Sequence, residues 1–150
     1  MELKIKALSP KVGNEIPFPS YATAGSAGMD LRACIDESVT VQPGEQALIP
    51  AGFAIALPSK DYVALIYARS GLAVKHGLSP ANCVGVIDSD YRGPIVVALR
   101  NYGKEPYTIE PGERVAQMVI TPVVQAAISV VDELDDTDRG AGGFGSTGRV

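Results

Sequence analysis

Residues 39–57, VTVQPGEQALIPAGFAIAL, show the pattern that decides the fold. Three short runs rich in apolar residues, 39–41, 47–50 and 54–57, are separated by stretches that contain proline or glycine. Such runs predict short β-strands between turns. The same pattern recurs at 3–8, 62–67, 95–99, 107–109 and 115–120. This spacing favours an all-β sandwich or barrel over a βαβ fold.

A short sequence echo marks two of the turns. VQPGEQA at 41–47 is matched by IEPGERV at 109–115. Each places Pro-Gly at the centre of a type II turn, because proline presets its own φ and glycine tolerates a positive one. We expect two similar hairpins and a pseudo-symmetric β fold, although seven residues are too few to establish a duplication.

One helix is expected inside the body, at 72–76. Ser70 can cap its start, and Gly77 stands where a left-handed residue commonly ends a helix. We interpret His76, in the last turn, as a partner of the helix dipole and not as a catalytic base. A second helical turn at 132–136 is a weaker candidate.

The composition changes at residue 132, where an acidic run leads into the glycine-rich stretch 139–148. This stretch has one large apolar residue, Phe144, so it has little to bury and should be mobile without a ligand. It lacks the GxxxxGK[ST] order of a P-loop. We therefore predict one β domain over 1–131 and a flexible C-terminal arm over 132–150 that closes over the active site.

Bulk properties exclude several classes of protein. The 150 residues suit one domain, and the formal net charge of −4 argues against binding to long nucleic acid. No apolar run approaches the ~20 residues of a membrane span. Cys34 and Cys83 form no metal or redox motif, and no secretory signal is visible at 1–10, so we expect a cytoplasmic protein with reduced thiols.

Five islands along the chain carry residues suited to chemistry. They are AGMDLRA (27–33), RSGLA (69–73), GVIDSDYRG (85–93), GERVAQM (112–118) and RGAGGFGSTG (139–148). In this order they resemble the five motifs of the trimeric dUTPase (dUTP diphosphatase) family, across nearly the whole chain. Ala68 and Pro94 depart from the residues most frequent beside these motifs, but neither carries a proposed chemical role.

The residues themselves give some of these islands a physical rationale. Arg69 and Ser70 stand at the predicted helix start, where an arginine and free N–H groups favour a phosphate. Asp88 and Asp90 are spaced to share a face of a strand in a predicted hairpin, although a turn there would break this rule. Asn82 and the backbone near Gly85 can read a base edge. The plainer interpretations are a capped helix and a polar turn.

The family resemblance implies more specific roles. Asp88 would position and deprotonate the water that attacks the α-phosphate of dUTP, and Tyr91 would stack on the sugar and exclude a ribose hydroxyl. Asn82 and the backbone of Gly85, Val86 and Ile87 would pair with uracil. The remaining substrate contacts would come from Arg69, Ser70, Gly71, Gln117, Arg139, Phe144, Gly145, Ser146 and Thr147, with Phe144 stacking on the base.

The resemblance also implies a distorted antiparallel jelly-roll-like barrel, a homotrimer with shared active sites, and Mg²⁺ as the cofactor. The sequence holds no dedicated metal cage, which suits an ion that enters on the substrate phosphates. Asp30 could hold one metal-bound water, but it could equally be the structural partner of an arginine. The product dUMP would serve dTTP synthesis, and removal of dUTP would limit uracil incorporation into DNA.

Two other functions compete with this one. A dCTP deaminase on a related fold would need a glutamate near the cytosine ring, and the third island offers only aspartates. A nucleotide-binding regulatory module would keep the pocket without turnover. Cys83 has no histidine base beside it in the sequence, so we do not expect nucleophilic catalysis.

Overall fold

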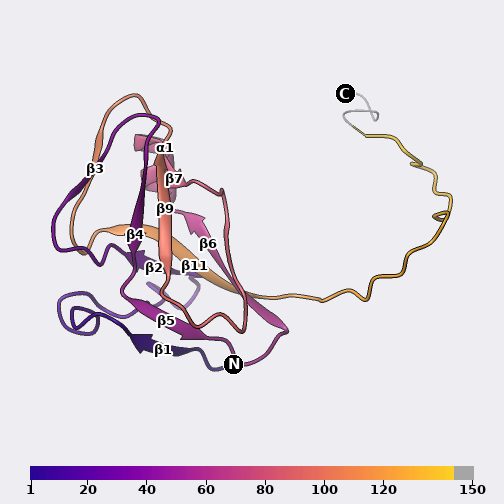
Figure 1. Cartoon of the computed structure of the whole chain (residues 1–150), viewed down its shortest axis with the longest axis horizontal. Coiled ribbons are helices and arrows are strands. Elements are labelled where there is room, and N and C mark those ends of the chain that lie inside the picture. The colour runs from indigo at the N-terminus through magenta and orange to yellow at the C-terminus, as the bar shows by residue number, and fades with distance from the viewer. Residues whose placement is uncertain (144–150) are drawn as a thin grey trace.

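The computed structural model describes residues 1–143 and shows a β body with one helix and a long C-terminal arm (Figure 1). Eleven strands and the helix alternate with turns. Their bounds are β1 Lys4–Ala7, β2 Gly28–Arg32, β3 Val39–Val41, β4 Gln46–Pro50, β5 Phe53–Ala56, β6 Tyr62–Ala68, α1 Ser70–His76, β7 Leu78–Pro80, β8 Gly85–Ile87, β9 Val96–Asn101, β10 Tyr107–Ile109 and β11 Arg114–Pro122. The all-β prediction with one short helix is confirmed.

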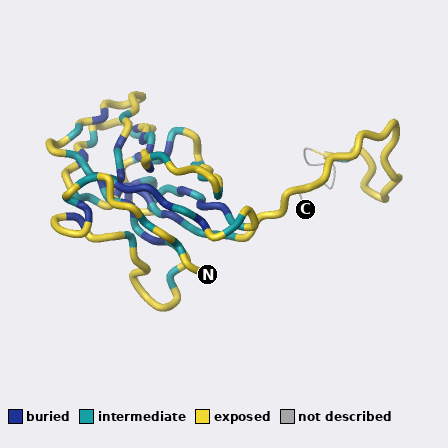
Figure 2. Tube along the Cα trace, turned by 60° about the horizontal axis from the view of Figure 1, so that its bottom comes forward, coloured by how far each residue is buried: buried dark blue, intermediate teal, exposed yellow. Residues whose placement is uncertain are grey.

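Every pairing between these strands is antiparallel. The largest sheet has the order β2-β11-β6-β8, a second has β4-β9-β7, and β1-β5 and β10-β3 form two-stranded ribbons. Their inner faces enclose one core, in which Leu31, Leu99, Ile109 and Met118 are completely buried. Figure 2 shows this buried interior against the exposed turns.

The two Pro-Gly turns form as predicted, but they are not hairpins. Gly44 and Gly112 have φ of 81° and 77°, and the N–H of Glu45 donates to the carbonyl of Gln42 at 3.0 Å. The strands on either side of each turn enter different sheets. Instead, β3 pairs with β10, so the strands that precede the two turns lie together. The echo therefore marks two turns whose preceding strands, β3 and β10, pair with each other. It does not mark two repeated hairpins.

The helix begins two residues before its predicted start. Arg69 is its N-cap residue and makes no side-chain capping bond, so the expected cap at Ser70 is wrong; Ser70 is the first helical residue. Gly77 ends the helix in the left-handed conformation, as predicted, and its N–H donates to the carbonyl of Ala73. His76 lies in the last turn, and its ring packs against Tyr107 with centroids 4.8 Å apart.

The arm leaves the body after the N–H of Val123 donates to the carbonyl of Asp61 at 2.8 Å. Residues 124–141 are exposed and stand off from the body in both ribbon views. The segment 132–136 contains no helix, so the weaker helix prediction is wrong. No helix in the described part of the chain is long and apolar enough to cross a membrane.

Candidate active site

A hollow of about 300 Å³ gathers most of the residues expected to read the base and to activate water. Strand β8 supplies Gly85, Val86 and Ile87, and the turn after it supplies Asp88 and Tyr91. Asn82 comes from the preceding turn, and the segment 94–96 closes the remaining side. The third island is not a hairpin, because β8 pairs with β6 and not with the strand that follows it.

The turn that carries Asn82 is tight. The N–H of Val84 donates to the carbonyl of Asn82 at 2.7 Å, closing a three-residue turn around Cys83. Cys83 has a φ of 63°, the one positive φ outside glycine in the described chain. Turns of this kind are rare and strained, and strain of this sort gathers at functional sites. The geometry therefore fixes Asn82 at the edge of the hollow.

The turn that carries Asp88 and Tyr91 is held by its own arginine. The Tyr91 N–H donates to the Asp88 carbonyl at 3.2 Å. One guanidinium nitrogen of Arg92 donates to the carbonyls of Ser89 and Tyr91, at 2.8 and 2.9 Å. Asp88 and Asp90 also line a second opening of this region beside the base of the arm. Asp90 does not line the hollow that holds Tyr91 and Asn82.

A separate hollow of about 390 Å³ gathers the residues expected to hold phosphates. It lies where β6 passes into α1, beside β2 and β11, and Ala22, Ser26 and Ala27 line another side. Its polar lining comprises Ser26, Asp30, Arg69, Ser70, Arg114 and Gln117. This hollow shares no lining residue with the first one.

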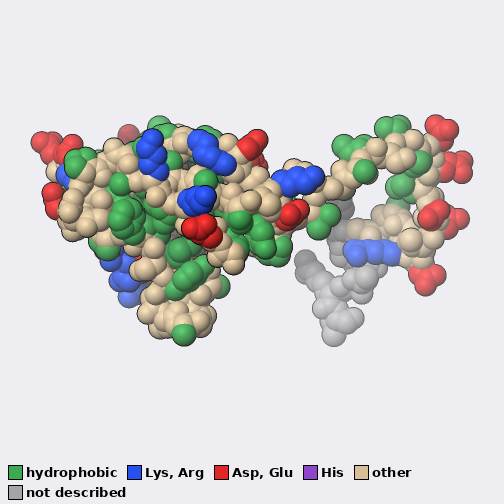
Figure 3. Space-filling view, turned by 90° about the horizontal axis from the view of Figure 1, so that it is seen from below, with side chains coloured by type: hydrophobic (Ala, Val, Ile, Leu, Met, Phe, Trp, Pro, Cys, Tyr) green, Lys and Arg blue, Asp and Glu red, His purple; other side chains and the backbone are tan. Residues whose placement is uncertain are grey.

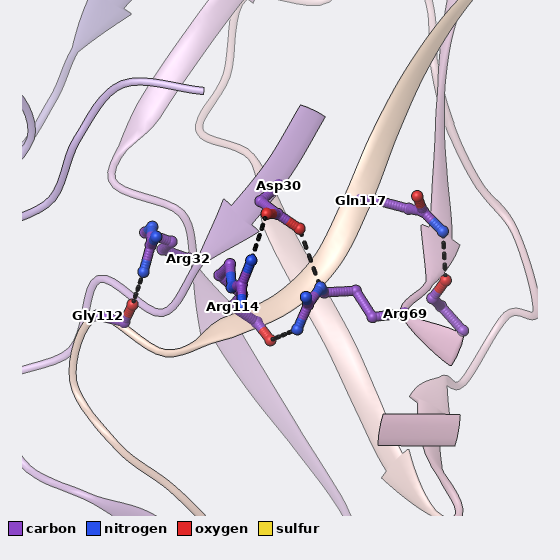
Figure 4. A network of polar contacts seen from close by, with 7 residues as sticks. Asp30, Arg32, Arg69, Gly112, Arg114 and Gln117 are labelled. Carbon is purple, nitrogen blue, oxygen red and sulfur yellow. Dashed lines mark hydrogen bonds and ion pairs between the residues drawn. The ribbon is translucent and has the colours of Figure 1, made fainter. Parts of the chain in front are cut away.

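Asp30 holds two arginines at this second hollow (Figure 4). Its Oδ1 accepts from Nε of Arg69 at 2.9 Å, and its Oδ2 accepts from Nη1 of Arg114 at 3.2 Å. Arg69 is tied a second time, through Nη1 to the backbone carbonyl of Arg114 at 3.2 Å. Two contacts on one guanidinium fix its plane and leave its other N–H groups free to meet an anion.

Gln117 is held at the wall of the same hollow. Its side-chain Nε2 donates to the carbonyl of Ala68 at 2.9 Å. Any Cβ at Gly28 would come within 2.7 Å of Gln117 Oε1, so the glycine leaves room for the amide. Gln117 therefore lines the second hollow with a fixed amide.

Tyr107 and Glu113 form a polar pair behind this hollow. The Tyr107 hydroxyl donates to Glu113 Oε1 at 2.5 Å, and Glu113 Oε2 accepts from the Glu110 N–H at 3.0 Å. Burial first, and the carboxylate beside it second, raise the pKa of Tyr107 to about 12. The pair closes the Pro-Gly turn that leads into β11, and so it supports the start of the strand that carries Arg114 and Gln117.

The predicted residues thus fall into two groups. Asn82, Gly85, Val86, Ile87, Asp88 and Tyr91 share the first hollow, and Asp30, Arg69, Ser70, Gly71 and Gln117 share the second. Arg139 lies on the arm, with Nε bonded to the Gly142 carbonyl at 3.0 Å. The remaining four, Phe144, Gly145, Ser146 and Thr147, lie outside the described residues.

Arg114 was not singled out from the sequence as a site residue. It stands in the fourth island, three residues before Gln117, and its charge faces Asp30 across the β2–β11 pairing. An arginine on a strand beside a chemistry-bearing glutamine was the available signal. The acidic partner was not readable, because it comes from a strand 84 positions earlier.

The β body offers few side chains that could bind a metal ion. Within residues 1–143 no three His, Cys, Asp or Glu side chains group closely enough to hold an ion. The oxygens on offer, from Asp30 and Asp88, are hard donors of the kind that Mg²⁺ prefers. Each oxygen of Asp30 keeps a second lone pair beside its arginine bond, so the carboxylate still fits a metal-bound water.

Comparison with known proteins points to one family. The dUTPase family model matches residues 14–148. Deoxyuridine 5'-triphosphate nucleotidohydrolase from Hahella chejuensis is 58% identical over 97% of this chain and 96% of its own. The enzyme of that name from an Enterobacter species is 54% identical over 99% and 97%.

A solved structure gives the same answer. The dUTPase of Staphylococcus bacteriophage 80alpha with dUpNHpp superposes with a TM-score of 0.86 at 28% identity, covering 98% of both chains. The sequence, the fold and the paired hollows therefore lead to one conclusion: the chain belongs to the dUTPase family.

Proposed function

We propose that this chain hydrolyses dUTP to dUMP and pyrophosphate. The observation that carries the proposal is the first hollow. There the Asp88 carboxylate, the Tyr91 ring and the Asn82 amide lie together beside the backbone of β8. No glutamate lines it, so the acid/base group of a deaminase is missing from this lining. The named activity of the relatives is the same reaction class.

In the reaction we propose, Asp88 orients a water molecule and accepts its proton. The water oxygen bonds to the α-phosphorus as the bond to the bridging oxygen breaks, so pyrophosphate leaves without a covalent enzyme intermediate. Aspartate carboxylates are weak bases near neutral pH, with an ordinary pKa of about 3.9. Orientation of the water must therefore contribute more than deprotonation.

The other residues bind and align the substrate. Asn82 and the backbone of Gly85, Val86 and Ile87 pair with uracil, while Tyr91 lies against the deoxyribose. Arg69, Ser70, Gly71 and Gln117 hold the phosphates. Mg²⁺ arriving with the triphosphate would neutralise charge on the phosphate oxygens, with Asp30 holding one of its waters. Both cysteines are free thiols, consistent with the reducing cytoplasm in which we place the enzyme.

We further propose that the active protein is a homotrimer with shared sites. We expect each shared site to combine the first hollow of one copy with the second hollow of another, since the two hollows of one chain have no lining residue in common. The arm also carries apolar residues that nothing in the described part of the chain covers: Val124, Ile128 and Val130 are 90, 92 and 94% exposed. Figure 3 shows this arm standing away from the body, with acidic side chains along its outer part.

The arm supplies the last part of the proposed site. Arg139, Phe144, Gly145, Ser146 and Thr147 would close over bound nucleotide, with Phe144 stacked on uracil and the polar residues on the distal phosphates. Closure would exclude water other than the reacting molecule. The domain boundary at residue 131 is part of this proposal, although the chain already leaves the body after Val123.

A substrate panel tests the proposed reaction. The purified protein with Mg²⁺ is given dUTP, UTP, dTTP or dCTP, and released pyrophosphate is measured. We expect rapid release from dUTP and little from the other three, because the hollow discriminates at both base and sugar. Equal turnover of all four, or ammonia released from dCTP, would contradict the proposal.

A further inference from the structure

The ring of Tyr91 rests on the backbone immediately after it. Its side chain is 44% exposed and lines the first hollow. The ring folds forward over residues 92–94, because its hydroxyl donates to the carbonyl of Pro94 at 3.1 Å. One end of the ring is thus anchored by a hydrogen bond.

Gly93 lies directly beneath this ring. A Cβ at Gly93 would stand 2.6 Å from Cζ and 3.0 Å from Cε2 of Tyr91, and nearer still to the hydroxyl oxygen. The φ of Gly93 is not among the positive values that favour glycine. An ordinary side chain is therefore excluded by the ring and not by the backbone conformation.

The surrounding contacts decide which group would yield to a larger residue. Arg92 ties the carbonyls of Ser89 and Tyr91, which braces the backbone of the turn. The atoms that a Cβ would meet are all at the far end of the Tyr91 side chain. Such an end can rotate away at low cost, so alanine at this position should displace the ring while the turn stays folded.

We propose that Gly93, together with the carbonyl of Pro94, is a positioning element that sets the place of Tyr91 and thereby the preference for dUTP over UTP. This inference rests on the role proposed above for Tyr91 against the sugar. A Tyr91 ring held at a fixed place excludes a ribose 2′-hydroxyl. A ring that has lost its packing on Gly93 and its hydrogen bond to Pro94 does not.

The test compares kcat/KM for dUTP and for UTP in the full-length protein. Gly93→Ala is the variant, and Gly25→Ala is the matched control, because a Cβ at Gly25 meets no atom within 4 Å. A single steric or hydrogen-bonding feature in a site is commonly worth about tenfold or more in discrimination. We therefore expect the dUTP/UTP ratio to fall at least ~10-fold in Gly93→Ala and to stay unchanged in Gly25→Ala.

A double-mutant cycle separates this role from a general structural one. If Gly93 acts through the ring, Gly93→Ala should change the ratio no further in a Tyr91→Ala background. The proposal is overturned if folded Gly93→Ala keeps the wild-type ratio, or if the ratio falls equally in both backgrounds.

Two further measurements keep the outcomes distinct. Thermal melting establishes that Gly93→Ala is folded; should it unfold, Tyr91→Phe takes its place, since it keeps the ring and removes only the anchor at Pro94. We expect Tyr91→Phe to lower the ratio, and an unchanged ratio would then overturn the inference. A wild-type protein without preference for dUTP would instead contradict the proposed function itself.

Discussion

Two carboxylates of one turn, Asp88 and Asp90, have different surroundings. Asp88 faces the first hollow, while Asp90, two residues later, lines only the opening beside the arm. Asp88→Asn keeps the shape of the side chain and removes its ability to accept a proton. We expect kcat to fall by roughly 10²–10⁴-fold, the usual contribution of a positioned base. Binding of dUpNHpp, followed by calorimetry, should change little.

Asp90→Asn is the matched control for this prediction. The substitution is the same and lies in the same turn, but it is outside the hollow that holds Tyr91. We expect its kcat to stay within about threefold of wild type, the scale of a surface change. Equal losses in the two variants would show that the turn as a whole, and not the Asp88 carboxylate, supports turnover.

Asp30 holds Arg69 and Arg114, so its proposed effect on the substrate is indirect. Asp30→Asn would leave an acceptor for Arg69 but turn an N–H₂ group toward one of the two guanidinium groups. We expect KM for Mg-dUTP to rise about tenfold, or about 1.4 kcal/mol, close to the lower end of the roughly 1.5–3 kcal/mol of a hydrogen bond to a charged group. Repeating the measurement over a range of Mg²⁺ concentrations tells whether the half-saturating Mg²⁺ concentration also shifts, as a role in holding a metal-bound water requires. Unchanged KM would refute both roles.

The turns between strands show what local sequence can and cannot predict. The Pro-Gly turns at Gly44 and Gly112 were predicted correctly, because these two residue types restrict φ by themselves. Their strand partners were not, because β3 and β10 are distant in the chain: Thr40 bonds Thr108 across 68 positions. Pairing at that separation is decided by the shared core and leaves no local signature.

Strand β2 was not predicted, although its sequence has the pattern of a strand. In β2, Met29 and Leu31 are buried, while Asp30 between them and Arg32 after them are less so, which is the period-two pattern of a half-buried strand. The strand β7 is three residues long and includes Ser79 and Pro80, so it lacks the β-branched and aromatic residues that predicted the equally short strands at 39–41 and 107–109. The site residues of the body come from the family motifs and their roles stay predictions, whereas their division between two hollows required the three-dimensional structure.

The turn between β10 and β11 should respond to high pH through Tyr107. Its pKa is raised to about 12, so between pH 10 and 12 the unfolded chain loses a proton that the folded protein keeps. Folding stability therefore falls with rising pH over that window. We expect the Tm of wild type to fall more steeply than that of Tyr107→Phe from pH 10 to 12. Below pH 10 the variant should be less stable by about 1 kcal/mol, for one lost hydrogen bond.

Tyr102→Phe serves as the control for this titration. Tyr102 is exposed, and its hydroxyl makes only a long contact of 3.5 Å to the Ala81 carbonyl. Its Tm should follow that of wild type across the whole range. A Tyr107→Phe variant that follows wild type as well would show that the bond to Glu113 contributes nothing to stability.

At the scale of the whole molecule, shared sites can be tested by mixing inactive variants. Arg69→Ala removes a phosphate ligand, and Asp88→Asn removes the proposed base, so each alone should be nearly inactive. If one site takes these residues from two subunits, random mixing of equal amounts leaves about a quarter of sites intact in a cyclic trimer. Co-refolded mixtures should then regain about that share of wild-type turnover.

Two controls complete the mixing experiment. Each variant refolded alone measures its residual activity, and light scattering measures the mass of the assembly. If both residues of a site came from the same subunit, no mixture would exceed the parent variants. A monomeric mass with full turnover would also contradict sharing.

The bare apolar side chains of Val124, Ile128 and Val130 have a consequence for biosynthesis. Translation proceeds from the N-terminus, so the ribosome releases this stretch only after the β body has been completed. These side chains are therefore exposed from the time they leave the ribosome until another chain covers them. Synthesis of many copies on one messenger RNA would keep sister chains close together. The apolar side chains would then be exposed for a shorter time and would bind fewer unrelated proteins.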